Sequence, residues 1–257
     1  MQIRPDVELA NASDVGSVRE ANEDYFLYSE PGSDEEFARR GRLILVADGM
    51  GGHQGGETAS RLAAETVRHV FFTSESAEPR EVLIEGFQLA QAAILAEAAD
   101  DPLLRGMGTT CSAAVVRAGK VWLGHVGDSR VYLLRGGEVS QITEDHSLVA
   151  QMVREGLLTE EQARTHEKRN VLTRALGVPS DSLAGDFPAE PIDLKVDDIL
   201  LFCTDGLHGL VEGSEMALTV AGQSLTEACK ELIALAIVRG GPDNITIQML
   251  AIRQVTQ

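Results

Sequence analysis

Cysteine and aromatic residues are scarce in this chain of 257 residues, which has three cysteines, one tryptophan and three tyrosines. The cysteines, Cys111, Cys203 and Cys229, are odd in number, form no Cys-x-x-Cys pair and all lie in apolar segments. This pattern argues against a disulfide framework and favours a reducing, cytoplasmic setting.

Long hydrophobic runs and positive charge are also in short supply. No stretch of 18 or more apolar residues occurs, and the first residues lack the apolar core of a signal peptide, so we expect no membrane association. Lysine and arginine number 22 against 40 aspartates and glutamates, which gives a formal net charge of −18. A surface this acidic repels phosphates and argues against nucleic acid as a partner.

Hydrophobic residues nevertheless make up 44% of the chain, enough to build a full core. No linker or repeat divides the sequence, so we expect one domain over residues 1–257. Short, often β-branched apolar segments bounded by Gly, Asp or Asn predict strands. They lie at residues 43–47, 111–116, 121–126, 131–134, 199–203 and 245–252. Residues 111–142 have the pattern of a meander, and the charged residues 29–42 that of an exposed loop between two strands.

Helical spacing of apolar residues predicts two long helices, over residues 57–72 and 81–99. A third helix is expected to begin near Ser224, which has capping-box spacing to Glu227. Two short helices follow the meander, the second capped by Thr159, and they predict a flap over about residues 146–176. Strands in a meander with helices set apart from them indicate an α+β fold, with antiparallel sheets covered by helices.

Four aspartates stand next to predicted strands. Asp48, Asp128 and Asp205 follow apolar segments, and Asp243 comes just before one. Asp-Gly pairs often make only hairpin turns, but the residues after Asp48 and Asp205 do not resemble a partner strand. Carboxylates gathered at strand ends repel one another unless cations neutralise them, and hard oxygen ligands favour Mg²⁺ or Mn²⁺.

The glycine-rich residues 49–57 lead into a predicted helix. They lack the Gly-Lys-Ser/Thr ending of a nucleotide-binding P-loop. Close approach of the backbone to an ion, with the carbonyl of Gly49 as a ligand, fits the glycines better.

Eight segments, in this order, carry a resemblance to a known family: residues 13–24, 46–57, 106–116, 124–137, 142–149, 170–177, 203–207 and 241–247. The chain resembles the type 2C protein phosphatases, which are metal-dependent serine/threonine phosphatases, and its motifs are similar to those of the bacterial branch. The resemblance runs over about residues 13–252. It implies a four-layer α-β-β-α sandwich, with two central antiparallel sheets flanked by helices and a small helical flap.

The resemblance also implies roles for particular residues. Asp48 would bridge two tightly bound Mn²⁺ or Mg²⁺ ions, with the Gly49 carbonyl, Asp205 and Asp243 completing the pair. Asp128 and Asp205 match the positions of a third, weaker metal. The remaining roles are water orientation by Glu23 and Asp24, and substrate phosphate binding by Arg19, which an arginine can do with two parallel hydrogen bonds.

Two metal ions lower the pKa of a water held between them, and the resulting hydroxide would attack phosphorus in line. Many eukaryotic relatives have a histidine after the Asp-Gly pair as proposed general acid, whereas this chain has Met50. Two alternatives for protonating the leaving alkoxide stay open, His53 and a metal-bound water.

Two other functions compete with this one. Cys111 and Arg117 have the spacing of cysteine-dependent phosphatases, but the residues between them contain no glycine and predict a strand. A catalytically inactive module that only binds phosphoproteins is the alternative from another class, although every implied metal ligand is present. The expected partners are phosphorylated proteins and a cognate serine/threonine kinase, and we expect a monomer.

Overall fold

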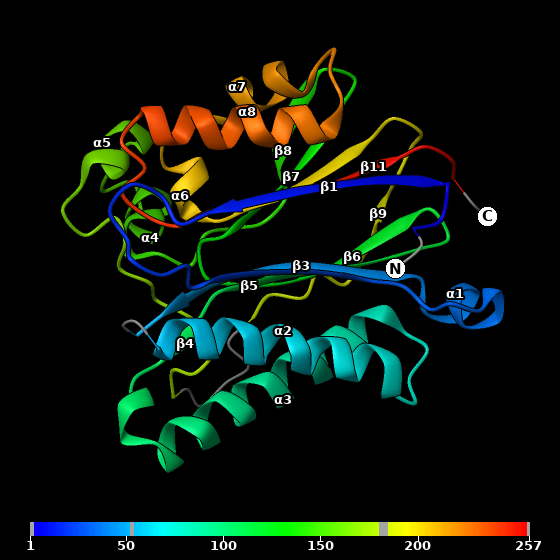
Figure 1. The fold of residues 1–257 in the computed structure, drawn as a ribbon, viewed down its shortest axis with the longest axis horizontal. Coiled ribbons are helices and arrows are strands. Elements are labelled where there is room, and N and C mark those ends of the chain that lie inside the picture. The colour runs from blue at the N-terminus through cyan, green and yellow to red at the C-terminus, as the bar shows by residue number, and fades with distance from the viewer. Residues whose placement is uncertain (1–2, 52–53, 180–184, 256–257) are drawn as a thin grey trace.

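Apolar side chains cover both faces of the central strands, and this determines how the layers stack. In strand β3 (Arg42–Met50), Leu43 and Leu45 join one hydrophobic cluster, and Ile44 and Val46 join another. Successive side chains of a strand point to opposite faces, so such a strand must be buried on both sides. The computed structural model, which describes residues 3–51, 54–179 and 185–255, accordingly has four layers (Figure 1).

Two sheets form the central layers, and all their strand pairs are antiparallel. The first has the order β1 (Val7–Asp14), β11 (Ile245–Ile252), β10 (Ile199–Cys203), β7 (Arg130–Arg135) and β8 (Glu138–Gln141). The second has the order β2 (Asp24–Ser29), β3, β5 (Cys111–Arg117), β6 (Lys120–Val126) and β9 (Ile192–Asp193), and β4 (Gly108–Thr109) also pairs with β3. The predicted pair of antiparallel sheets is confirmed.

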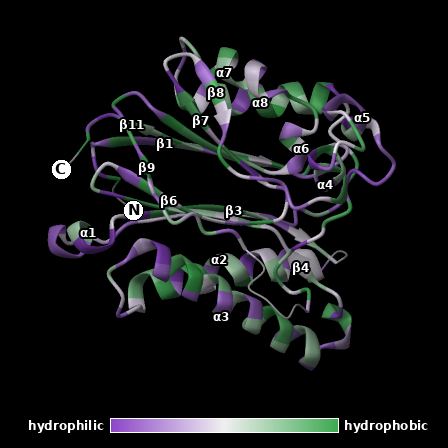
Figure 2. Cartoon of the chain, turned by 180° about the vertical axis from the view of Figure 1, so that it is seen from behind, coloured by the Kyte–Doolittle hydropathy of each residue, from purple (hydrophilic) through white to green (hydrophobic). Residues whose placement is uncertain are grey.

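Helices cover the outer face of each sheet, and hydrophobic residues concentrate between the layers (Figure 2). Helices α2 (Gly55–Thr73) and α3 (Pro79–Asp100) pack on the second sheet. Helices α6 (Asp205–His208), α7 (Gly213–Val220) and α8 (Leu225–Val238) pack on the first. The third hydrophobic cluster lies between the two sheets, so the predicted sandwich is confirmed.

Local sequence determines where several helices begin. The Ser224 hydroxyl accepts a hydrogen bond from the backbone N–H of Glu227 at 3.3 Å, as the capping pattern predicts. Thr159 and Gln162 form a complete capping box at the start of α5 (Glu160–Thr165). Together with α4 (Leu148–Arg154), α5 lies within residues 146–176, whose role as a substrate-selecting flap stays a prediction.

Residues 29–42 do not form a simple loop, so that prediction is wrong. They contain helix α1 (Asp34–Arg40), and the Ser33 hydroxyl caps it by accepting a hydrogen bond from the Glu36 N–H at 3.2 Å. Acidic residues in its first turn and basic residues in its last complement the helix dipole. The high charge of this segment therefore stabilises a short helix.

The predicted meander over residues 111–142 is also wrong as a single sheet. Strands β5 and β6 pair in the second sheet, whereas β7 and β8 pair in the first. The turn at residues 127–130 carries the chain from one sheet to the other. A turn between two apolar strands has the same sequence pattern whether the strands pair within one sheet or belong to two different sheets. This explains the error.

Helix α3 is long and apolar enough to cross a membrane by length and composition, and 33% of its most apolar window is buried. Core helices of water-soluble proteins have the same composition. Here Leu83, Phe87 and Ile94 of α3 are fully buried against α2 and the second sheet.

Candidate active site

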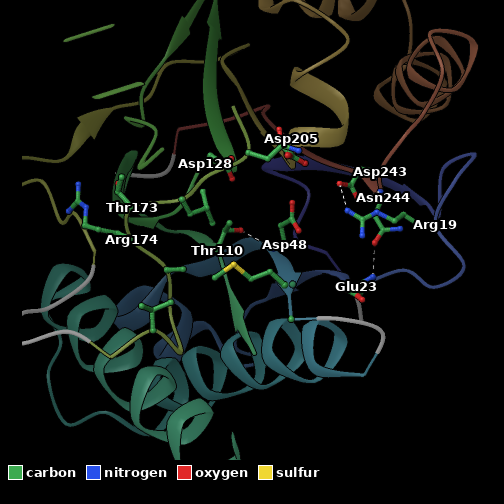
Figure 3. Close-up of a pocket in the computed structure, with 17 residues that line it drawn as sticks. Arg19, Glu23, Asp48, Thr110, Asp128, Thr173, Arg174, Asp205, Asp243 and Asn244 are labelled. Atoms are coloured by element: carbon green, nitrogen blue, oxygen red, sulfur yellow. Dashed lines mark hydrogen bonds and ion pairs between the residues drawn. The ribbon is translucent and has the colours of Figure 1, made fainter. Parts of the chain in front are cut away.

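Strand ends from both sheets meet at one end of the sandwich, around a pocket of about 330 Å³ (Figure 3). Asp48 lies in β3, and Asp128 lies in the turn after β6. Asp205 is the first residue of α6, two residues after the end of β10, and Asp243 lies just before β11. Predicted site residues lining the pocket are Arg19, Glu23, Asp48, Gly49, Asp128, Asp205 and Asp243. The structure thus brings together the four aspartates that the sequence places at separate strand ends.

Asp48, Asp128 and Asp205 have an unusually high proton affinity. Desolvation, followed by the charges of neighbouring aspartates, raises the pKa of Asp48 and of Asp128 well above the usual range. Desolvation and the charge of Asp243 raise the pKa of Asp205 to about 6. Asp48 and Asp205 are partly accessible through the pocket, but the protein around them removes most bulk water. Their mutual repulsion requires either protons or a bound cation.

Asp24 lies directly behind the pocket lining. Desolvation raises its pKa to about 7, in spite of a hydrogen bond that its Oδ2 accepts from the Thr204 hydroxyl at 2.9 Å. Its Oδ1 is buried without a hydrogen-bond partner, and so is the Oδ1 of Asp205. Buried carboxylate oxygens without a donor are costly unless a ligand satisfies them.

The set of oxygens fits Mg²⁺ or Mn²⁺, which prefer carboxylate, carbonyl and water ligands. Across the described ranges, no three acidic, histidine or cysteine side chains already stand close enough to form a complete cation site. What indicates a cation here is therefore the desolvation and repulsion of the carboxylates, and their unpaired oxygens.

Gly49 directly follows Asp48 at a point where neighbouring backbone atoms leave no room for a side chain. A Cβ atom at this position would lie 2.1 Å from the carbonyl oxygen of Gly56 and 2.6 Å from that of Glu23. No other residue fits without moving backbone atoms, which explains the glycine. The main chain at Gly49 thus lines the pocket beside Asp48.

Arg19 lies at the rim of the pocket and pairs with Asp243. Its Nη2 donates to the Asp243 Oδ2 at 2.7 Å, and this hydrogen bond raises the pKa of the guanidinium. The Arg19 side chain is 52% exposed, so it is open to the pocket and to solvent. In the absence of a cation, this arginine partly neutralises Asp243.

Asn244 organises the site, although the sequence analysis did not single it out. Its Oδ1 accepts from the Glu23 N–H at 2.8 Å, and its Nδ2 donates to the carbonyls of Val15 and Ala21 at 2.9 Å each. This buried amide fastens the loop that carries Arg19 beside Asp243. In the sequence, only its position directly after Asp243 indicates this role of Asn244, because the residues to which it is hydrogen-bonded are more than 220 positions away.

Thr110 is a second residue that the sequence analysis missed. Its hydroxyl accepts a hydrogen bond from the Asp48 N–H at 2.9 Å and bonds to the Ser129 hydroxyl at 2.7 Å. It therefore ties the backbone of Asp48 to the turn that holds Asp128.

Two other predictions concern neighbouring residues. Met50 lines the pocket, whereas His53, the candidate general acid, lies outside the described residues. Cys111 is the first residue of β5, and burial raises the pKa of its thiol to about 12. A buried thiol at a strand start does not form the anion-binding loop of a cysteine-dependent phosphatase, so that alternative is excluded.

Comparisons with known proteins agree with this geometry. The protein phosphatase 2C family model matches residues 20–232. The chain is 35% identical over 252 residues to the serine/threonine phosphatase stp of Listeria monocytogenes, covering 95% of each protein. It is also 35% identical to the serine/threonine protein phosphatase PstP of Mycobacterium tuberculosis, over 93% of this chain but only 43% of that longer protein.

Solved structures have the same fold. Stp1 from Staphylococcus aureus superposes with a TM-score of 0.87 and 29% identity, covering 99% of this chain and 98% of that one. The catalytic domain of PstP in complex with two manganese ions superposes with a TM-score of 0.82 and 32% identity, covering 96% and 99%. By sequence and by fold, this chain belongs to the protein phosphatase 2C family.

Proposed function

We propose that this chain is a metal-dependent phosphatase that hydrolyses phosphoserine and phosphothreonine in proteins. One observation carries the proposal: four aspartates from both sheets, three of them strongly desolvated, converge on one pocket with Arg19 at its rim. An anionic pocket in an anionic protein repels a phosphate monoester unless cations occupy it. The two manganese ions of the related PstP structure support the same conclusion.

Particular oxygens of the pocket would hold the ions. Asp48, the Gly49 carbonyl, Asp205 and Asp243 would bind two of them tightly. Asp128, together with Asp205, would hold a third more weakly. When bound, Mg²⁺ or Mn²⁺ supplies positive charge that acidifies water and neutralises phosphate oxygens. Glu23, which lines the pocket, and Asp24, which lies behind its lining, would accept hydrogen bonds from water held by the ions and orient it.

Arg19 would hold the substrate. A guanidinium offers two parallel donors to two phosphate oxygens and keeps its charge at any physiological pH. In the structure only Nη2 is engaged by Asp243, and the rest of the half-exposed side chain borders the pocket. Its charge would offset the negative charge that builds on the transferring oxygens.

The substrates we propose are phosphorylated proteins, and the enzyme would reverse the action of a serine/threonine kinase in the cytoplasm, as a monomer. The family comparisons give no support to the alternative of an inactive phosphoprotein-binding module.

The direct test of this function is release of phosphate from matched peptides. With Mn²⁺ present, we expect the wild type to hydrolyse phosphoserine and phosphothreonine peptides and to act poorly on the phosphotyrosine peptide of the same sequence. Equal rates on all three would contradict serine/threonine selectivity. No release from any of them would instead favour the inactive binding module.

Replacement of Arg19 tests its role in substrate binding. Arg19→Ala should raise KM and lower kcat/KM by roughly ten- to a hundredfold, because a charge-assisted bidentate contact is worth about 1.5–3 kcal/mol. Arg19→Lys should recover only part of this, since an ammonium cannot bind two oxygens side by side. Steady-state kinetics on one phosphopeptide, with calorimetry of Mn²⁺ binding, measures both effects.

The matched control is Arg239→Ala, which breaks a comparable pair with Glu215 at 2.7 Å outside the pocket. It should leave KM unchanged. An unchanged KM in Arg19→Ala would show that Arg19 serves only as a partner of Asp243.

A further inference from the structure

His146 is a buried residue outside the pocket lining, and both nitrogens of its ring are hydrogen-bonded. It is 1% exposed. Its Nδ1 lies 3.2 Å from the backbone nitrogen of Gly127, and its Nε2 lies 2.9 Å from the Asp186 Oδ2. A backbone N–H can only donate, so Nδ1 must carry the lone pair. The proton therefore sits on Nε2 and is donated to Asp186.

Gly127 is the residue directly before Asp128, and its conformation leaves little freedom. Its φ of +101° is a left-handed value, and a Cβ there would come within 2.5 Å of the Thr110 side chain. His146 binds both backbone polar groups of Gly127, since its own N–H also donates to the Gly127 carbonyl at 2.8 Å. One histidine thus holds Gly127, the residue of the turn that directly precedes Asp128.

Asp186 connects that histidine to the last part of the flap. Its Oδ1 accepts from the Arg174 Nη1 at 2.7 Å while its Oδ2 accepts from His146. Its backbone N–H and C=O both pair with His125 of β6, at 2.7 and 3.0 Å. Although burial disfavours its charge, the bonds from Arg174 and His146 prevail and hold its pKa below the usual value.

The residues beside Arg174 border the pocket opposite Arg19 (Figure 3). Thr173 and Arg174 both line it, and the Thr173 N–H donates to the His146 carbonyl at 2.8 Å. His146 therefore contacts the final residues of the flap on one side and the Asp128 turn on the other. Nowhere in the described residues does a hydrogen bond join Arg174 to Gly127 directly.

We propose that His146 is a positioning residue that couples the final residues of the flap to the turn holding Asp128, through the chain Arg174–Asp186–His146–Gly127. A substrate that contacts the pocket at Thr173 or Arg174 thereby adjusts the position of Asp128. The meaning of this coupling for catalysis rests on the role proposed above for Asp128.

Amide hydrogen exchange at Gly127, measured by NMR on protein in EDTA, tests the coupling. Arg174→Gln replaces the half-exposed, charged group at one end of this hydrogen-bonded series. It should speed exchange at Gly127 about threefold. His146→Asn keeps an acceptor near the Nδ1 position but cannot reach Asp186, so it should speed exchange by a similar factor. His146→Gln keeps the donor to Asp186 and removes the acceptor for Gly127, and should speed exchange about tenfold.

A double variant distinguishes coupling through His146 from a general loss of local stability. If His146 transmits the effect, adding Arg174→Gln to His146→Asn changes Gly127 exchange no further. Arg239→Gln, which breaks the distant pair with Glu215, should leave Gly127 unaffected. An unchanged rate in Arg174→Gln, or the same acceleration in both backgrounds, overturns the proposal.

A measurement on the wild type does not depend on any variant folding. Nitrogen-15 shifts of the His146 ring at pH 7 should show a proton on Nε2 and none on Nδ1. A doubly protonated ring or the opposite tautomer overturns the proposal. Because both experiments use protein without metal or substrate, their failure leaves the proposed phosphatase activity standing, and loss of that activity leaves the coupling standing.

Discussion

Asp48→Asn should lower kcat on a phosphopeptide by about a thousandfold or more, because a neutral amide cannot hold two cations in place of a carboxylate. The same change should stabilise the metal-free protein at pH 8. Desolvation and four neighbouring aspartates already penalise the charge of Asp48, and the amide removes that penalty. A gain of ~1 kcal/mol shifts Tm by about 2–4 °C in a chain of this size.

Kinetics with Mn²⁺ and thermal unfolding in EDTA measure the two effects. Asp197→Asn is the control, since the Asp197 side chain is 81% exposed and asparagine tolerates its φ of +68°. It should change neither quantity. Activity of Asp48→Asn within tenfold of the wild type would remove Asp48 from the centre of the mechanism.

The metal-free protein should lose stability as pH rises above about 6.5. A carboxyl whose pKa is raised in the folded state contributes stability while it keeps its proton, and this is lost as pH passes through the folded pKa. Asp24, with a pKa of about 7, loses its proton in this range, and the raised pKa values of Asp48 and Asp128 act in the same direction. Each such carboxyl contributes a slope of up to about 1.4 kcal/mol per pH unit.

The pH range of this measurement matters because, at lower pH, buried histidines make stability rise with pH instead of fall. Burial lowers the pKa of His125 to about 4 and of His208 to about 3. Their unfolded forms bind protons below about pH 6.5, so these residues add stability as pH rises toward that value. Above it the raised pKa values of the buried carboxyls make stability fall as pH rises.

Urea unfolding at several pH values, in EDTA and with Mn²⁺, checks this prediction. The free energy of unfolding should fall with pH in EDTA and rise with pH when Mn²⁺ competes with protons for the same oxygens. The slope in EDTA should be shallower in Asp48→Asn. A flat or rising profile in EDTA would mean that these carboxyls do not repel one another as proposed.

The sequence predicted the parts of the fold that depend on local chemistry. Apolar strand segments ending in Asp48, Asp128 and Asp205 were enough to predict a shared carboxylate site, and the caps at Thr159 and Ser224 were found where expected. The assignment of strands to sheets was not predictable, because the turn at residues 127–130 gives no indication that it crosses between sheets.

The supporting contacts of the site depend on distant pairs, and this is why the sequence did not reveal them. Asn244 fastens a loop more than 220 residues earlier in the chain, and Arg19 reaches Asp243 across a similar separation. His146 and Asp186 are both polar residues with no distinctive local pattern, and their contact at 2.9 Å depends on the bridge that places Asp186 beside His125 of β6.

Phosphate release by metal-stripped protein, before and after Mn²⁺ is added, tests the central claim most directly. The charged groups that line the pocket among the described residues are the carboxylates, Arg19 and Arg174, and without cations the carboxylates repel a phosphate. We therefore expect no turnover of a phosphoserine peptide in EDTA and full recovery when excess Mn²⁺ or Mg²⁺ is restored. Full activity in the metal-stripped protein would contradict the account.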